Sequence, residues 1–267
     1  LVGDNADALV TGCGPSRIAD WAYVANYKLS GPALERIENS GFGAVQGIDN
    51  ANNTVGKRVN LDYFSVEIEQ PPIINGTRLT PQETFDYFRK NINNFADKFT
   101  PHSPLDASIW QSNNPLTAVM GITMMGDPAF NFIELVDGDV ICSEYTGDSW
   151  MFTTLFANPV GGNGYHPVSG NRRFGYFMND AGNLNIYTQG VDRTTTWYHS
   201  LANGIVGFAL ADELWKNMQA NFIVFIEANR GAMSTNTPTH ENVLRPNWSA
   251  ARELLKSSQP ITQIPCN

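Results

Sequence analysis

The densest chemistry in this chain lies between Tyr165 and Arg193, where "YHPVSGNRRFGYFMNDAGNLNIYTQGVDR" sets a histidine, arginines and aspartates among glycines and aromatic residues. Guanidinium groups offer planar paired donors that suit carboxylates and other anions, and an aspartate can orient an arginine or a histidine. The residue types therefore indicate a ligand-binding site that includes Arg172 and Arg193. A second interpretation stays open, in which Asp192 and an arginine form a structural ion pair and His166 caps a loop.

A β-hairpin would bring these residues together. The turn sequence "NDAG", residues 179–182, separates two segments in which apolar and polar residues alternate. Pairing of the two segments would place the His166 to Arg172 end beside the Gln189 to Arg193 end. We expect a cluster at one rim of a sheet, with Tyr187 of the returning strand as a further ligand-binding candidate.

The segments "HPVSGNRRFG" and "YTQGVDR" resemble stretches in uncharacterised bacterial proteins, some of them exported or toxin-associated. The resemblance covers about residues 165–193 and implies an exported, effector-like protein. Its partners would then be a small-molecule or peptide substrate, and a secretion apparatus or an immunity protein. A composition rich in Asn, Gly and Thr and poor in Lys is also typical of exported proteins, so we expect secretion or export.

A possible nucleophile, Cys13, stands just before a predicted helix in "TGCGPSRIADW". Unpaired amides at a helix start lower a thiol's pKa and favour the thiolate. The Cys-Gly-Pro triplet followed by a helix resembles the start of C39-type papain-fold peptidases, in which a histidine and then Asp or Asn follow. The resemblance implies catalysis by Cys13 as nucleophile, His166 as base and Asp192 as the residue that orients it. The alternative is an inert or disulfide-bonded Cys13.

The elements that would position these residues follow from hydrophobic spacing. A helix is expected after Pro15, and "VNLDYFSVEIEQPP" predicts a half-buried strand. A capping box at Thr80 and Glu83 predicts a helix whose aromatic stripe reaches Phe99. From Leu116 to Arg193, recurring turn signals such as Asp137-Gly138 predict an antiparallel meander of about five or six strands. A long helix ending near a left-handed Gly231 and a short helix over residues 247–256 follow.

These elements predict an α+β fold, an antiparallel meander sheet packed against long amphipathic helices. Their order resembles the helix-grip arrangement of the START-like ligand-binding superfamily, in which a curved sheet wraps a long helix around a cavity. Residues 1–56 would form an N-terminal helical and loop segment, and residues 57–267 one compact α+β domain.

Composition limits the class of protein. A formal net charge of −9 with only 17 Lys and Arg speaks against nucleic-acid binding through a broad basic surface. No apolar run reaches the roughly 18 residues that cross a bilayer. The scattered histidines lack the spacing of a zinc site, so we expect no metal and no cofactor.

Two functional hypotheses follow. The first is a hydrolase that uses Cys13, His166 and Asp192, or a His/Arg/Asp site. The second is a non-catalytic protein that binds a small molecule between the sheet and the C-terminal helix.

Overall fold

The computed structural model describes residues 15–49, 54, 57–96, 99–124, 136–158, 162–195, 205–235 and 238–256. In this part of the chain, strands of a 10-stranded antiparallel sheet follow the order β11-β2-β10-β9-β8-β7-β6-β5, with β12 also pairing with β2 and β1 with β8. The strands are β1 (Gly43–Val45), β2 (Asn60–Gln70), β5 (Phe99–Pro101), β6 (Val119–Met124), β7 (Val136–Tyr145), β8 (Ser149–Ala157), β9 (Val168–Met178), β10 (Leu184–Thr194), β11 (Ala232–Met233) and β12 (Thr239–Leu244). Two short strands, β3 (Ile73–Ile74) and β4 (Thr77–Arg78), pair separately.

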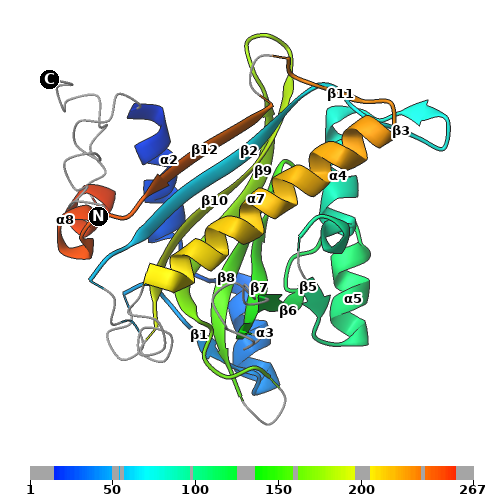
Figure 1. The fold of residues 1–267 in the computed structure, drawn as a ribbon. Coiled ribbons are helices and arrows are strands. Elements are labelled where there is room, and N and C mark those ends of the chain that lie inside the picture. The colour runs from blue at the N-terminus through cyan, green and yellow to red at the C-terminus, as the bar shows by residue number, and fades with distance from the viewer. Residues whose placement is uncertain are drawn as a thin grey trace, which may run out of the picture.

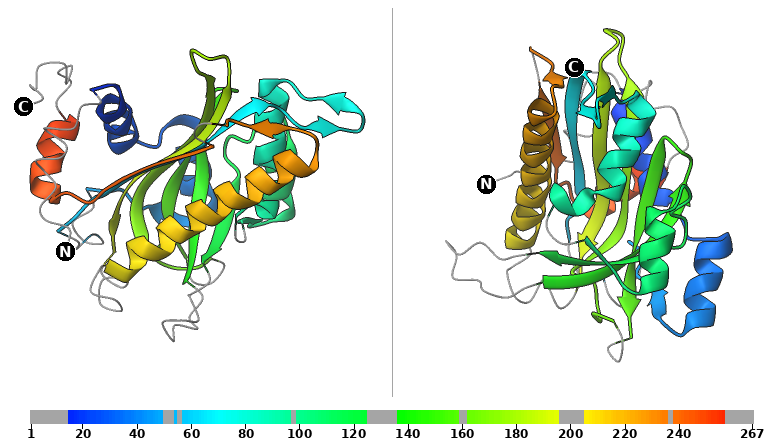
Figure 2. Two further views of the ribbon diagram at one scale, coloured as in Figure 1. Left: turned by 45° about the horizontal axis from the view of Figure 1, so that its top comes forward. Right: turned by 90° about the vertical axis from the view of Figure 1, so that its right-hand side faces the viewer.

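Helices cover both faces of this sheet. They are α2 (Pro15–Asn26), α3 (Gly31–Ser40), α4 (Pro81–Lys90), the 3₁₀ turn η1 (Ile92–Asn94), α5 (Pro104–Gln111), α7 (Ile205–Ala228) and α8 (Trp248–Lys256). The long helix α7 runs diagonally across one face (Figure 1), and Figure 2 shows α3 on the opposite side of the sheet from α7. The predicted α+β fold, a meander sheet packed against long helices, is confirmed.

Two main apolar cores lie on opposite faces of the sheet. The larger core joins the sheet to α4, α5 and α7 and includes Phe88, Trp110 and Phe222. On the other face, Trp21 and Val24 of α2 pack with Leu255 of α8 against strands of the same sheet. A smaller cluster on α3 adds to the cover. The sheet is therefore buried on both faces over much of its area.

The capping box that begins α4 forms as predicted. The Thr80 hydroxyl accepts a hydrogen bond from the Glu83 amide, and the Glu83 carboxylate accepts one from the Thr80 amide at 2.8 Å. The aromatic stripe is buried as expected. The helix itself is shorter than predicted, however, because α4 ends at Lys90 and Phe99 begins β5. Asn93 Oδ1 accepts from the Phe99 amide at 2.5 Å, so an asparagine side chain competes with helical hydrogen bonding there.

Two local predictions were wrong. Asp137-Gly138 lies inside β7 rather than in a turn, where the two residues pair with Thr123 and Ile122 of β6. The glycine serves packing instead of a turn, because a Cβ at Gly138 would lie 2.3 Å from the His166 ring. After α7, the left-handed residue is Arg230, with φ 58°, rather than Gly231. Among the described helices, none combines the length and apolar character that crossing a membrane requires.

Candidate functional site

The predicted hairpin forms and defines one end of the site. Strands β9 and β10 pair from Val168 opposite Thr194 to Met178 opposite Leu184, with the turn at residues 179–183. Asp192 lies opposite Gly170, and Gly190 lies opposite Arg172. A Cβ at Gly190 would lie 2.1 Å from Arg172 Nη2, so the glycine leaves room for the arginine side chain to cross β10.

Strand alternation divides the predicted ligand-binding residues between the two faces of the sheet. Arg172 and Asp192 point toward α7 and line a cavity. Tyr187 lies on the opposite face and stacks on Tyr63, with ring centroids 5.6 Å apart. Arg193, also on that face, donates to the Ile48 carbonyl at 3.1 Å and packs over Trp248. The structure therefore does not bring Arg193 or Tyr187 together with Arg172 and Asp192.

The cavity lies between α7 and the inner face of the sheet and measures about 70 Å³. Apolar side chains form most of its wall, namely Phe99, Ile122, Val140, Phe152, Ala211, Leu214 and Trp215. His166, Arg172 and Asp192 line it as well, so its wall carries a polar region. Small-molecule sites typically combine apolar walls with a few convergent polar groups.

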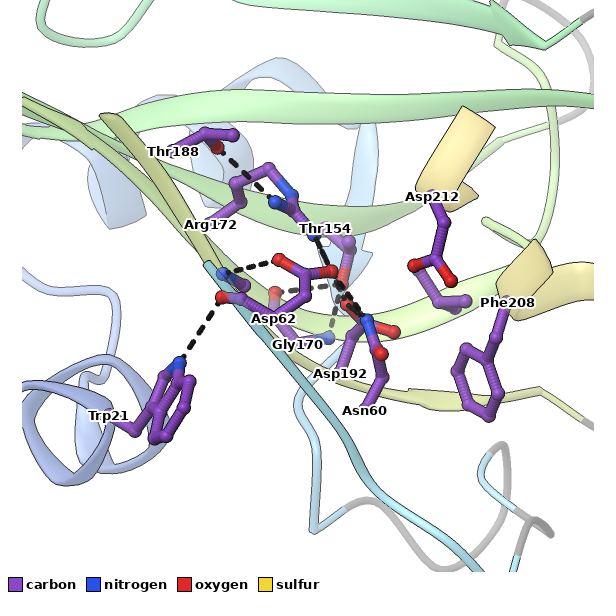
Figure 3. A network of polar contacts seen from close by, with 12 residues as sticks. Trp21, Asn60, Asp62, Thr154, Gly170, Arg172, Thr188, Asp192, Phe208 and Asp212 are labelled. Atoms are coloured by element: carbon purple, nitrogen blue, oxygen red, sulfur yellow. Dashed lines mark hydrogen bonds and ion pairs between the residues drawn. The ribbon is translucent and has the colours of Figure 1, made fainter. Parts of the chain in front are cut away.

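A buried charge network holds Arg172 in place. Its Nη2 donates to Asp62 Oδ2 at 2.6 Å and its Nη1 to the Thr188 hydroxyl at 3.2 Å. Its guanidinium carbon lies 4.1 Å from the centroid of the Trp215 ring. Asp62, which comes from β2 and is fully buried, also accepts from the Gly190 amide at 3.0 Å. Figure 3 shows Asp62, Arg172 and Thr188, from β2, β9 and β10, lying close together.

Asp192 is the less well paired carboxylate of this network. Its Oδ2 accepts from Asn60 Nδ2 at 3.3 Å and lies 3.8 Å from Arg172 Nη2. The same Asn60 nitrogen donates to Asp62 at 2.7 Å. Burial, and next the Asp62 carboxylate, raise the pKa of Asp192 to about 7, although Arg172 and Asn60 oppose the rise. Asp192 therefore exchanges a proton near neutral pH.

His166 is held in the loop before β9. The side chain of Gln46 makes two hydrogen bonds to the backbone of His166. Its Nε2 donates to the His166 carbonyl, and its Oε1 accepts from the His166 amide. The imidazole Nδ1 lies 2.8 Å from the Val168 carbonyl oxygen. Burial lowers the pKa of His166 to about 4, so the ring is neutral at physiological pH. No hydrogen bond joins His166 to Asp192 in the described residues, although both line the cavity.

A second ion pair lies beside the network. Arg245, just after β12, bonds both carboxylate oxygens of Asp212 on α7 at 2.7 Å. Burial raises the pKa of Asp212, and Arg245 opposes that rise. The pair ties α7 to the chain just after β12, the strand that pairs with β2. Asp212 follows Ala211, which lines the cavity, and Figure 3 shows Asp212 projecting from α7.

The predicted nucleophile Cys13 lies outside the described residues, as does Cys266, so the Cys13, His166 and Asp192 arrangement stays a prediction. Cys142 lies buried in β7, where burial raises the pKa of its thiol. Within the described ranges, no three His, Cys, Asp or Glu side chains are arranged to hold a metal ion.

Sequence reasoning missed Asn60, Asp62 and Trp215. The strand containing Asn60 and Asp62 was predicted, but its pairing with β10 joins residues more than a hundred positions apart in the chain, such as Asp192 and Asn60. A buried aspartate at an inward position of a strand is the one signal that could have indicated Asp62, because such a charge requires a partner.

Comparisons with known proteins give little further information. No family model matches the sequence, and no curated protein matches it. Among solved structures, the di-domain ARO/CYC StfQ from the steffimycin biosynthetic pathway is similar with 10% sequence identity and a TM-score of 0.37. The similarity covers 65% of this chain and 51% of that protein, so the chain spans about half its length. A TM-score of this size does not establish a shared fold.

Proposed function

We propose that this protein binds a small, largely apolar molecule in the cavity between α7 and the sheet. The observation that supports this function is the cavity itself, whose apolar wall carries the polar side chains of His166, Arg172 and Asp192. An apolar cavity of about 150 Å³ is large enough for benzene. A cavity of about 70 Å³ therefore suits a smaller molecule or the end of a longer one.

Filling the cavity tests this proposal. Ala211 lines the cavity from α7, so we expect Ala211→Phe to occupy the space and to weaken binding of a small probe such as 1-butanol at least tenfold. Ligand-observed NMR measures the affinity. Val224→Phe is the matched control, because Val224 lies on the same helix and is 65% exposed. Equal binding by Ala211→Phe and the unmodified protein, with both folded by circular dichroism, would contradict the proposal.

A second candidate function is hydrolysis in the same cavity, and one observation favours it. Asp192, with its pKa of about 7, can donate or accept a proton at neutral pH and lines the cavity with His166. A thiol route would add Cys13 as nucleophile. Export from a bacterial cell, with a secretion apparatus or an immunity protein as partner, remains a prediction from the sequence.

Turnover of p-nitrophenyl acetate separates the routes to hydrolysis. If Asp192 is the acid or base, Asp192→Asn lowers the turnover number at least a hundredfold and removes its pH dependence near 7. If the thiol route operates, Cys13→Ala has that effect instead. Turnover unaffected by either substitution would exclude both routes and leave the binding function.

A further inference from the structure

The charges around the cavity do not balance. Among the described residues, the carboxylates of Asp62, Asp192 and Asp212 face the two guanidinium groups of Arg172 and Arg245. Arg245 is held by both oxygens of Asp212, and Arg172 lies closest to Asp62. Asp192 is therefore the carboxylate without a cation of its own.

One polar atom beside Asp192, the side-chain oxygen of Asn60, also lacks a hydrogen-bond donor. Asn60 donates its Nδ2 hydrogens toward both carboxylates, which fixes the orientation of its amide. Its Oδ1 is then a fully buried acceptor with no hydrogen-bond partner in the described part of the chain. A buried acceptor left unpaired costs free energy, so the surroundings of Asp192 are short of hydrogen-bond donors as well as of positive charge. A ligand cation with hydrogen-bond donors would supply both to Asp192.

The apolar wall suits the rest of such a ligand. Phe99 and Phe152 lie stacked with centroids 6.0 Å apart, and Trp215 lies 6.4 Å from Phe99. Aromatic faces attract an ammonium group electrostatically and pack against an alkyl chain. The cavity wall carries one carboxylate, Asp192, and one guanidinium, Arg172, and that arginine is already bonded to Asp62, so an anionic ligand would have to compete with Asp62 for it.

We propose that the ligand of this cavity is a primary ammonium on a short apolar chain, with the ammonium bonded to Asp192 and the chain against the aromatic wall. This inference rests on the proposed binding function and names its ligand class. The charged and titratable groups that face Asp192 are Asp62 from β2, Arg172 from β9, and the Asp212–Arg245 pair between α7 and the end of β12, with neutral His166 along the cavity wall.

The test compares three probes of equal chain length, n-butylamine, 1-butanol and butyrate, by ligand-observed NMR at pH 8 and pH 6. At pH 8 we expect butylamine to bind at least tenfold more tightly than 1-butanol, and butyrate to bind most weakly. Between pH 8 and pH 6 the affinity for butylamine should fall about tenfold, because a carboxyl with a pKa of about 7 goes from mostly ionised to mostly protonated. The affinity for 1-butanol should stay unchanged or rise.

Asp192→Asn removes the negative charge with almost no change in shape. It should abolish both the preference for butylamine and its pH dependence, while 1-butanol still binds. Asp180→Asn is the matched control, because Asp180 is exposed in the β9–β10 turn and should leave all three affinities unchanged.

The possible outcomes separate the two proposals. If 1-butanol binds as tightly as butylamine at both pH values, the ammonium inference fails and the binding function stands. If no probe binds, the binding function itself fails. Should Asp192→Asn not fold, the pH dependence of the unmodified protein still decides, because an affinity for butylamine that does not change between pH 8 and pH 6 overturns the inference.

Discussion

At the scale of residues, the site depends on an unequal pair of carboxylates. The Asp62 carboxylate accepts hydrogen bonds from Arg172 at 2.6 Å, from Asn60 at 2.7 Å and from the Gly190 amide at 3.0 Å. The Asp192 carboxylate accepts one from Asn60 at 3.3 Å, and its oxygen lies 3.8 Å from Arg172 Nη2. Two neighbouring carboxylates resist ionising together, so the proton resides on the one with fewer donors. This difference makes Asp192 the carboxylate whose pKa is raised.

A stability measurement tests this assignment. The pKa of Asp192 is about 7 in the folded protein and about 3.9 in an unfolded chain. Between those values the folded state binds more protons than the unfolded state, so its stability falls as pH rises through this window. Asn cannot ionise, and Asp192→Asn should therefore gain stability relative to the unmodified protein between pH 5 and pH 8, on the order of 2 kcal/mol.

Urea unfolding at pH 5, 6.5 and 8 measures this change, with Asp180→Asn as the control. A variant that is less stable than the unmodified protein by the same amount at every pH would show that Asp192 is ionised and stabilised by Arg172 throughout the range.

At the scale of elements, sequence patterns correctly predicted the helix and strand features that depend on interactions between neighbouring residues. The capping box of α4 and the strand at β2 follow from neighbouring residues and appear in the structure. The predicted half-buried character of β2 was wrong, because Leu61 and Ser65 are buried as well as Phe64 and Val66. The extra length predicted for α4 and the predicted turn at Asp137-Gly138 failed for a different reason. Asn93 accepts from the Phe99 amide six residues further on, which favours the start of β5 over continued helix. Gly138 makes room for His166, which comes from a distant segment, and residue spacing near Gly138 could not indicate that contact.

The candidate site shows the same limit. His166, Arg172 and Asp192 could be placed together from sequence because one hairpin carries the strands and the adjoining loop. Asp62, Asn60 and Trp215 complete the site from β2 and α7, and no local pattern specifies which strand pairs with β10 or where α7 crosses the sheet. The assignment of Arg193 and Tyr187 to the same cluster neglected the two faces of a strand.

At the scale of the whole molecule, the two faces of one sheet contribute to two separate apolar cores. Leu61 and Val191 of β2 and β10 pack toward α2 and α8, while Phe64 and Ile186 of the same strands pack toward α4 and α7. The Trp21 indole donates to the backbone carbonyl of Asp62 at 3.2 Å, so α2 also touches the strand that holds the charge network. The two faces therefore depend on the same backbone.

This shared sheet predicts a single cooperative unfolding transition that includes the helices near the N-terminus. Val24 of α2 is fully buried, so Val24→Ala should lower the free energy of unfolding by about 2 kcal/mol through lost burial and a small cavity. Far-ultraviolet and near-ultraviolet circular dichroism should then report the same shifted melting temperature, because α2 cannot leave the sheet without exposing Leu61 and Val191. Val224→Ala, at an exposed position of α7, should leave that temperature almost unchanged. If the protein instead shows two transitions, and Val24→Ala lowers the melting temperature of the first transition without changing that of the second, then the N-terminal segment, residues 1–56, folds separately from the sheet.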